Sequence, residues 1–160
     1  MKLSFKDQTT LILGQWFFTG RSPVAPGTVG SLGTLPLFLL CRPLPTWAYW
    51  SLTGAIAVGG VAIGSRCAAL LQDEDPPSVV IDEVAGVMIA LGFVAQGSVW
   101  QWLVAWILFR ILDITKPWFI HDAQNLRPSG LGIMADDVLA GVFAGAGAAV
   151  LPLVLDYASL

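Results

Sequence analysis

The sequence is organised around one segment, Val79-Val80-Ile81-Asp82-Glu83-Val84-Ala85-Gly86. Two adjacent carboxylates begin an otherwise apolar run, and the next formal charge along the chain is Arg110. Carboxylates at the head of a segment that enters a core or a bilayer are costly unless a cation or hydrogen bonds meet them. In the first turn of a helix, the helix dipole would instead stabilise them. The pair by itself is compatible with both interpretations.

Acidic residues recur beside two further apolar runs. Asp113 closes the run that follows the Asp82-Glu83 pair, and Asp136-Asp137 open the last one. This recurrence favours a shared site over an isolated dipole effect.

The composition indicates one domain with unusually little charge. The chain has 160 residues, of which 56% are hydrophobic and 12% charged, and its mean hydropathy is +0.74. Ordinary soluble domains carry about 25% charged residues, so we expect much of the surface to face lipid. A net charge of −3 excludes a general electrostatic attraction to nucleic acid. We treat residues 1–160 as a single domain of undetermined oligomeric state.

Long uncharged stretches predict membrane helices. Asp, Glu, Lys and Arg are missing from residues 22–41, 43–65, 84–109 and 138–155. A helix that crosses the hydrocarbon core needs about 20 apolar residues. We therefore predict spanning helices at about residues 47–65, 79–95, 99–115 and 135–155. The predicted fold class is all-α, a compact helical bundle integral to the membrane with about four to five spanning or re-entrant helices.

The first uncharged stretch changes character along its length. Residues 22–31 are rich in Pro, Gly, Ser and Thr and are predicted to form a loop. Residues 32–40 suit a short buried helix, which is either re-entrant or starts below the membrane surface. Before this stretch, residues 11–18 follow Lys2, Lys6 and Asp7 and suit an amphipathic helix at the interface.

The loop charges predict an orientation. If the helix near residues 32–41 rises from the cytoplasm and the next helix returns, the basic loop residues gather on one side, except Arg42. An excess of Lys and Arg marks the cytoplasmic side, so the N-terminus and the two long loops are predicted to lie there. The same tracing brings the loop at residues 22–31 to that surface together with Asp82, Glu83, Asp113, Asp136 and Asp137.

Clustered carboxylates predict a divalent-cation site. Acids at close quarters repel and raise one another's pKa unless a cation lies among them. Oxygen ligands on facing helices suit Mg²⁺ or Mn²⁺, with waters and a substrate phosphate completing an octahedron. The predicted metal ligands are Asp82, Glu83, Asp136 and Asp137 as a group. Neighbouring helical positions differ in direction by about 100°, so one member of each pair could coordinate while the other orients a water or a further donor. Asp113 either joins them or pairs with Arg110 and Lys116, which lie three residues to either side.

The loop at residues 22–31 offers groups suited to an anion. Gly27 and Gly30 allow the backbone to approach a ligand, and Thr28 and Ser31 carry hydroxyls. The Gly-Lys-Ser/Thr of a nucleotide P-loop is missing. Positive charge for a phosphate could come from Arg21, Arg110, Lys116 or Arg127.

Four blocks of the sequence resemble the phosphatidylglycerophosphatase A family, in the family's order. They are SPVAPGTVGS at residues 22–31, IDEVAG at 81–86, FRILDITKP at 109–117 and GIMADDVLAG at 132–141. The resemblance implies an all-helical, magnesium-dependent lipid phosphatase of the bacterial inner membrane. Such an enzyme hydrolyses phosphatidylglycerophosphate to phosphatidylglycerol and phosphate at the cytoplasmic leaflet.

The predicted reaction is a metal-assisted hydrolysis of a phosphomonoester, with a covalent phospho-aspartate route as an alternative. The predicted catalytic set is Asp82, Glu83, Asp113, Lys116, Asp136 and Asp137. The predicted phosphate-binding set is Arg21, Pro26, Gly27, Thr28, Gly30, Ser31 and Arg110.

Two other functions could also explain acidic residues beside apolar segments. A membrane ion or metal transporter would also use intramembrane acids, but it favours acids near the bilayer centre rather than at helix ends. A structural membrane subunit would need basic partners for its acids, and few basic residues lie near Asp82 and Asp136 in the sequence.

Overall fold

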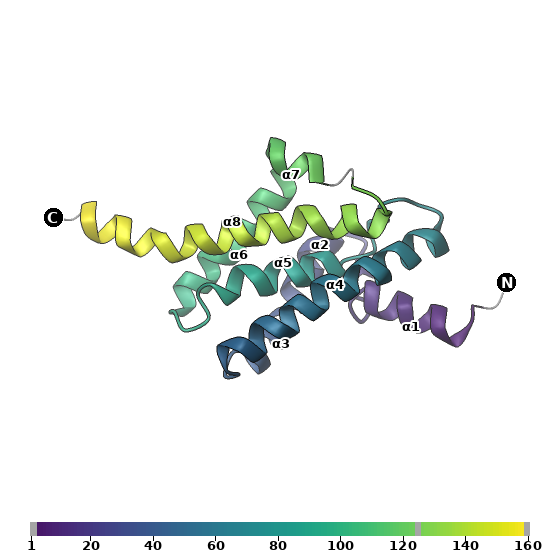
Figure 1. Cartoon of the computed structure of the whole chain (residues 1–160), viewed down its shortest axis with the longest axis horizontal. Helices are drawn as coiled ribbons and strands as arrows, with labels where there is room; N and C mark the ends of the chain where they lie inside the picture. The colour runs from purple at the N-terminus through teal and green to yellow at the C-terminus, as the bar shows by residue number, and fades with distance from the viewer. Residues whose placement is uncertain (1–2, 124–125, 159–160) are drawn as a thin grey trace.

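The computed structural model describes residues 3–123 and 126–158, and this part of the chain contains helices and connections without a strand (Figure 1). The helices are α1 (Phe5–Gly14), the short 3-10 helix η1 (Thr19–Arg21), α2 (Pro26–Gly33), α3 (Leu35–Cys41), α4 (Thr46–Leu71), α5 (Ile81–Gly92), α6 (Val99–Thr115), α7 (Trp118–Ala123) and α8 (Ser129–Ala158). The predicted all-α fold class is confirmed.

Helix α5 lies at the centre of the bundle. It contacts α2, α4, α6 and α8, and Figure 1 shows it between α4 and α8. Nine of its 12 residues are buried, among them every residue from Val84 to Leu91. On the α4 side, the buried Tyr49 hydroxyl donates a hydrogen bond of 2.7 Å to the carbonyl oxygen of Met88. The continuous apolar run after Glu83 therefore packs against protein on all sides.

Fewer helices are long enough to span a membrane than the sequence predicted. Within the described residues, two helices are long and apolar enough to cross a membrane: α4 and residues Ser129–Pro152 of α8. Helix α5 has 12 residues, a length of about 18 Å, whereas the hydrocarbon core is about 30 Å thick. The prediction of four to five spans is therefore too high. Hydropathy alone does not distinguish a helix surrounded by protein from one surrounded by lipid.

Residues 26–33 form helix α2, so the predicted loop at residues 22–31 is wrong over its second half. Pro26 occupies the start of the helix, where its fixed φ is helical and its missing N–H needs no partner. Ala25 precedes it in a left-handed conformation, with a φ of 47°. Pro26 therefore begins a helix rather than marking a loop.

Other boundaries shift by smaller amounts. Helix α6 has the predicted bounds, and α8 begins six residues before the predicted 135. The amphipathic helix predicted at residues 11–18 is instead α1, which ends at Gly14 and packs against α4. It is followed by three aromatic residues with positive φ, Trp16, Phe17 and Phe18.

Two glycines allow α5 and α8 to approach closely. A Cβ atom on Gly141 would lie 2.4 Å from the carbonyl oxygen of Gly86. A Cβ atom on Gly86 would lie 2.4 Å from Cε2 of Phe109 and 2.8 Å from the carbonyl oxygen of Asp137. Because these glycines follow the acidic pairs by about one helical turn, their close contact also brings the acidic ends of α5 and α8 together.

Replacement of Gly141 by alanine tests this packing. The added methyl group meets backbone that cannot move aside cheaply, so we expect Gly141→Ala to lower the free energy of unfolding by about 1–3 kcal/mol. The matched control is Gly54→Ala on α4, where an added Cβ meets nothing within 4 Å. That change should raise stability by about 0.5–1 kcal/mol, because alanine favours a helix interior over glycine. Denaturation curves showing equal stability for both variants would contradict the close contact.

Candidate functional site

A cavity of about 590 Å³ lies where helix ends converge. The starts of α2 and α5, the end of α6, the first turns of α8 and the connection between α4 and α5 all line it. The antiparallel helices thus bring the acidic ends together, as the sequence tracing predicted. All residues of the predicted catalytic set line this cavity: Asp82, Glu83, Asp113, Lys116, Asp136 and Asp137.

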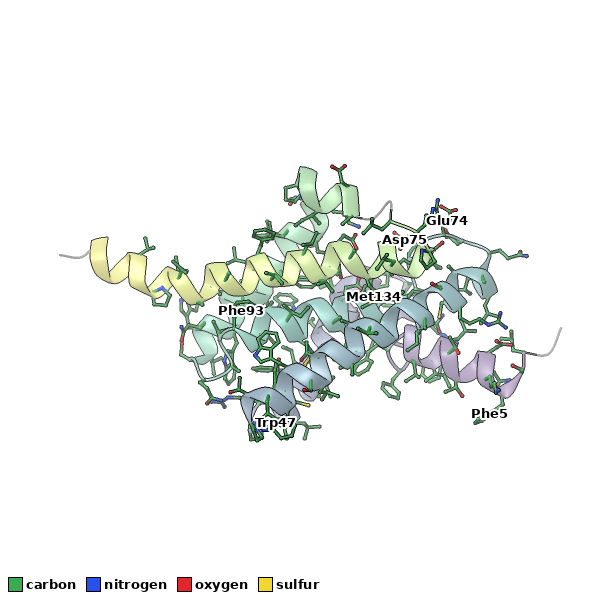
Figure 2. All side chains as sticks on the ribbon, in the orientation of Figure 1. Phe5, Trp47, Glu74, Asp75, Phe93 and Met134 are labelled. Atoms are coloured by element: carbon green, nitrogen blue, oxygen red, sulfur yellow. The ribbon has the colours of Figure 1, made fainter. Side chains whose placement is uncertain are left out.

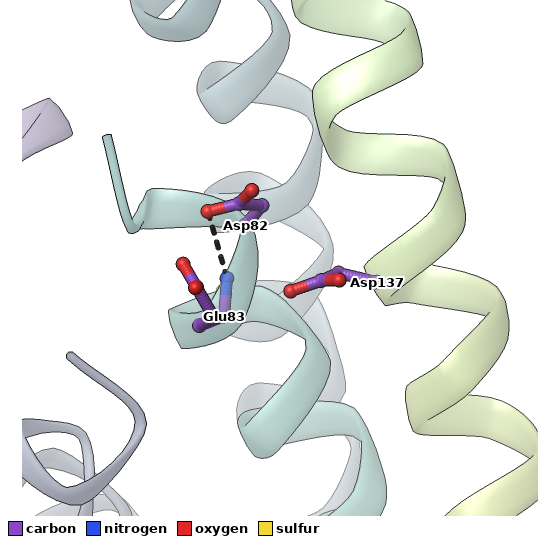
Figure 3. A group of neighbouring side chains, drawn as sticks. All are labelled: Asp82, Glu83 and Asp137. Carbon is purple, nitrogen blue, oxygen red and sulfur yellow. Dashed lines mark hydrogen bonds between the residues drawn. The ribbon is translucent and has the colours of Figure 1, made fainter. Parts of the chain in front are cut away.

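Three carboxylates form the centre of the site (Figure 3). Asp82, Glu83 and Asp137 each offer an oxygen, and these oxygens lie within 4.8 Å of one another. Asp137 is only 2% exposed. Among the described residues, Glu83 Oε2 and Asp137 Oδ2 are buried without a hydrogen-bond partner. Three hard oxygen donors, two of them from carboxylates with an unpaired buried oxygen, have the chemistry to hold a divalent cation such as Mg²⁺.

The two acidic pairs occupy different places on their helices. Asp82 and Glu83 lie in the first turn of α5, and Asp82 Oδ1 accepts a hydrogen bond of 3.0 Å from the backbone N–H of Glu83 (Figure 3). Stabilisation by the helix dipole therefore applies to this pair. Asp137 lies eight residues after Ser129, the first residue of α8, and the dipole acts mainly within the first turn. Its burial beside the other two acids therefore requires another explanation, such as a bound cation.

Asp136, one member of the second predicted pair, forms an ion pair with Lys116. Its Oδ2 accepts a hydrogen bond of 2.5 Å from Lys116 Nζ, and its Oδ1 accepts one of 3.1 Å from the backbone N–H of Asp137. Lys116 follows the end of α6 with a left-handed φ of 40°. The structure thus gathers three of the four predicted ligands and ties the fourth to a lysine that lines the cavity.

Asp113 pairs with Arg110, one of the two roles that the sequence left open. Asp113 Oδ2 accepts a hydrogen bond of 2.5 Å from Arg110 Nη1, which also lies 4.0 Å from Glu83 Oε1. Arg110 Nη2 donates to Thr28 Oγ1 at 3.4 Å, whereas its buried Nε has no partner among the described residues. Arg110 therefore connects α6 to α5 and α2 and lines the cavity between them.

Part of the predicted phosphate-binding set lines the cavity. Pro26, Gly27 and Thr28 are lining residues at the start of α2, and Arg110 faces them from α6. A Cβ atom on Gly27 would lie 2.1 Å from Glu83 Oε1, so any larger residue there would displace this carboxylate. Glycine at this position lets the start of α2 approach the acidic cluster.

The rest of that set lies outside the cavity lining. Arg21 Nε donates a hydrogen bond of 2.7 Å to Gln15 Oε1, and Gly30 packs against Val80. Ser31 is fully buried and donates to the carbonyl oxygen of Thr28 at 2.9 Å. Because residues 26–33 are helical, successive side chains point in different directions, and only the first turn faces the site.

Sequence reasoning missed the rim contributed by the connection between α4 and α5. Glu74 and Asp75 line the cavity, and Figure 2 shows them beside the start of α8. Arg127, considered as a phosphate partner, donates from Nη2 to Glu74 Oε2 at 3.0 Å. The available signal was the segment Asp73-Glu74-Asp75-Pro76-Pro77, an acidic turn shortly before the Asp82-Glu83 pair.

The electrostatics of the site follow from burial of like charges. Burial raises the pKa of Glu83 to about 8; Asp137 and Asp113 add to this rise, while Asp82 and Arg110 oppose it. Burial and the neighbouring Glu83 likewise raise the pKa of Asp82 well above its usual value. Burial lowers the pKa of Lys116, but the ion pair with Asp136 outweighs this and raises it overall. If every acid of the cluster were ionised, it would carry more negative charge than its surroundings stabilise, and for this reason Asp82 and Glu83 retain their protons to higher pH.

The raised pKa of Glu83 predicts how stability depends on pH in the absence of metal. The folded protein holds this proton up to about pH 8, whereas the ordinary pKa of a glutamate side chain is 4.5. More protons are bound in the folded state between these values, so stability should fall as the pH rises through that window. Glu83→Gln removes the titrating group and should flatten this decline.

Melting temperatures measured with a chelator at several pH values from 5 to 8 test this expectation. The matched control is Glu74→Gln, whose side chain is 75% exposed and which should keep the wild-type slope. A stability that rises with pH over this window in the wild-type protein would contradict the burial of the Glu83 carboxylate.

The fold and the site together define a class. This is a helical protein whose cavity places three close carboxylates beside an arginine and a lysine, a combination suited to phosphoryl chemistry. The chain belongs to the phosphatidylglycerophosphatase A family, whose model matches residues 12–152.

Relatives from three bacteria are similar over most of their length. Phosphatidylglycerophosphatase A of Escherichia coli (strain K12) is 38% identical over 136 residues, which cover 82% of this chain and 76% of the relative. The enzyme of the same name from Haemophilus influenzae is 37% identical, with coverage of 83% and 82%. A Bacteroides thetaiotaomicron protein described as "Putative phosphatidylinositol-3-phosphatase" is 40% identical, with coverage of 83% and 87%. No solved structure matches the chain.

Proposed function

We propose that this protein hydrolyses phosphatidylglycerophosphate to phosphatidylglycerol and inorganic phosphate. Membership of the phosphatidylglycerophosphatase A family and two relatives of that name support this substrate. The observation that carries the proposal is the cavity in which Asp82, Glu83 and Asp137 lie beside Arg110 and Lys116. A transport function has no support, because the three relatives are all named as phosphatases.

We further propose that Asp82, Glu83 and Asp137 hold Mg²⁺. Carboxylate oxygens are the ligands that Mg²⁺ prefers, and two of the oxygens here are buried without a partner. Buried like charges are unfavourable unless a cation offsets them. When bound, the metal ion neutralises phosphate charge and lowers the pKa of a bound water.

The side chains of the chain itself bind and orient the phosphate in this proposal. Phosphoryl transfer spreads charge over the equatorial oxygens of the phosphate, so positioning and electrostatic stabilisation supply most of the rate. Arg110 brings positive charge to the cavity lining, and Thr28 adds a hydroxyl from the start of α2. Asp113 and Asp136 act as positioning residues. Asp113 holds Arg110 at the cavity, and Asp136 holds Lys116 there.

We propose that α4 and α8 anchor the enzyme in the bacterial inner membrane with the cavity facing the cytoplasm. Only 22% of an apolar 18-residue stretch of α4 is buried, so most of this helix presents apolar side chains outward. The cavity lies just beyond Leu71, the last residue of α4, and beside Ser129, the first residue of α8. Both candidate spans thus have the cavity at one end, which suits a site at a membrane surface. The basic loop residues favour the cytoplasmic side.

Charge removal at the cluster tests the metal proposal. Asp82→Asn and Asp137→Asn nearly preserve side-chain volume, so we expect folding to persist while phosphate release at limiting Mg²⁺ falls roughly 100-fold or more. Mg²⁺ should also raise the melting temperature of the wild-type protein, because a ligand that binds only the folded state stabilises it. Both variants should lose this shift.

The matched control is Asp73→Asn, on an exposed aspartate that does not line the cavity. It should retain both activity and the Mg²⁺-dependent shift. Near-normal turnover and an unchanged shift in both cluster variants would refute these ligands.

The two hydroxyls of α2 should have separable roles. Thr28 lines the cavity and contacts Arg110, so Thr28→Val should slow phosphate release by roughly ten- to a thousandfold with little change in stability. Ser31 is the hydrogen-bond acceptor of the Trp106 indole, at 3.2 Å. Ser31→Ala leaves that donor unpaired and should cost about 1–3 kcal/mol of stability, while most turnover per folded molecule is retained. Melting curves and phosphate release on the same preparations check this, and a reversed pattern would move the phosphate site deeper along α2.

A further inference from the structure

A second cavity lies close to the proposed active site and is almost entirely apolar. It has a volume of about 330 Å³ and lies between the α2–α3 segment and the first two turns of α6. We call it the apolar groove. Its lining includes Leu32, Leu35 and Leu39 on one wall and Val99, Leu103 and Trp106 on the other.

The apolar groove and the active-site cavity share both of their walls. On α2, Thr28 lines the cavity and Leu32 lines the groove. On α6, Arg110 lines the cavity and Trp106 lines the groove. Each pair is four residues apart, which is about one helical turn or 6 Å. The groove therefore begins one turn from the proposed phosphate-binding residues and extends away from them.

Hydrogen bonds mark the boundary between the polar and the apolar region. Arg110 Nη2 donates to Thr28 Oγ1 at 3.4 Å on the cavity side. One turn further, Trp106 Nε1 donates to Ser31 Oγ at 3.2 Å. This bond leaves the indole ring free to line the groove without an unpaired N–H in an apolar site. The same two helices therefore change from polar to apolar within one turn.

The groove is open to the surroundings rather than filled by the protein. Val99 is 70% exposed, Leu39 54% and Leu103 44%. Contiguous exposed apolar side chains of this kind mark a binding groove or a membrane contact. From Arg110 to Val99 the wall formed by α6 extends about 17 Å, so an elongated apolar ligand fits the groove better than a compact one.

We propose that the apolar groove binds one acyl chain of the lipid whose phosphate lies in the acidic cavity. This inference rests on the proposed function. A phospholipid carries its phosphate at one end and its hydrocarbon at the other, and the cavity and the groove follow in that order along α2 and α6. A soluble phosphomonoester would use the cavity and leave the groove empty.

Narrowing the groove tests the proposal. Leu103→Trp adds bulk to one wall, and activity is compared on long-chain phosphatidylglycerophosphate in mixed micelles and on the same headgroup without acyl chains. We expect kcat/KM for the long-chain substrate to fall roughly tenfold, the range for a misfit in an apolar pocket. The chain-free headgroup should be hydrolysed at the wild-type rate. Leu39→Trp on the opposite wall should reproduce this selectivity.

The matched control is Leu52→Trp on α4. Leu52 is 37% exposed against 44% for Leu103, and it lines neither the groove nor the cavity. This variant should hydrolyse both substrates like the wild-type protein. A loss of long-chain activity equal to that of Leu103→Trp would indicate a general effect on membrane contact and would overturn the groove proposal.

A direct readout uses the wild-type protein. A non-hydrolysable phosphonate analogue with a photoactivatable acyl chain should crosslink to α2, α3 and α6, and Leu103→Trp should reduce that labelling. Crosslinks concentrated on α4 would overturn the proposal, as would normal chain selectivity in both groove variants. Failure of the wild-type protein to release phosphate from either substrate would instead overturn the proposed function, so the two failures are distinguishable.

Discussion

The close contact between α5 and α8 is the constraint on which the site depends. Gly86 and Gly141 remove the side chains that would separate the two helices, and the acidic pairs lie about one turn before them. Packing that is favourable for the core thus forces carboxylates of like charge together in a poorly solvated place. The rest of the site can be understood as the means by which that charge is offset.

Two ion pairs divide the acids by role. Arg110 holds Asp113 and Lys116 holds Asp136, which leaves Asp82, Glu83 and Asp137 facing one another. Each pair also holds a basic side chain, Arg110 or Lys116, at the cavity. The two acids outside the central cluster, Asp113 and Asp136, therefore still contribute, because each orients a basic side chain that a phosphate would meet.

The position of the site fits a substrate that is polar at one end and apolar at the other. Both candidate membrane helices have the acidic cavity at one end, and the apolar groove lies one turn from it along α2 and α6. Helix α5 spans no membrane in this arrangement. It is a buried helix whose first turn places Asp82 and Glu83 at the cavity.

The all-α class, the bounds of α6 and the convergence of the acidic helix ends could be predicted from the amino-acid sequence, because they follow from apolar runs, turn residues and charge spacing along the chain. Four blocks of the sequence also led to the correct family. Whether an apolar helix packs against protein, as α5 does, or remains exposed, as α4 does, depends on its neighbours in the folded protein. The folded structure also shows that Asp136 pairs with Lys116, whereas Asp137 joins Asp82 and Glu83. The two neighbours differ because successive helical side chains point about 100° apart. For the same reason, Thr28 lies at the cavity while Ser31, on another face of α2, is buried in the core.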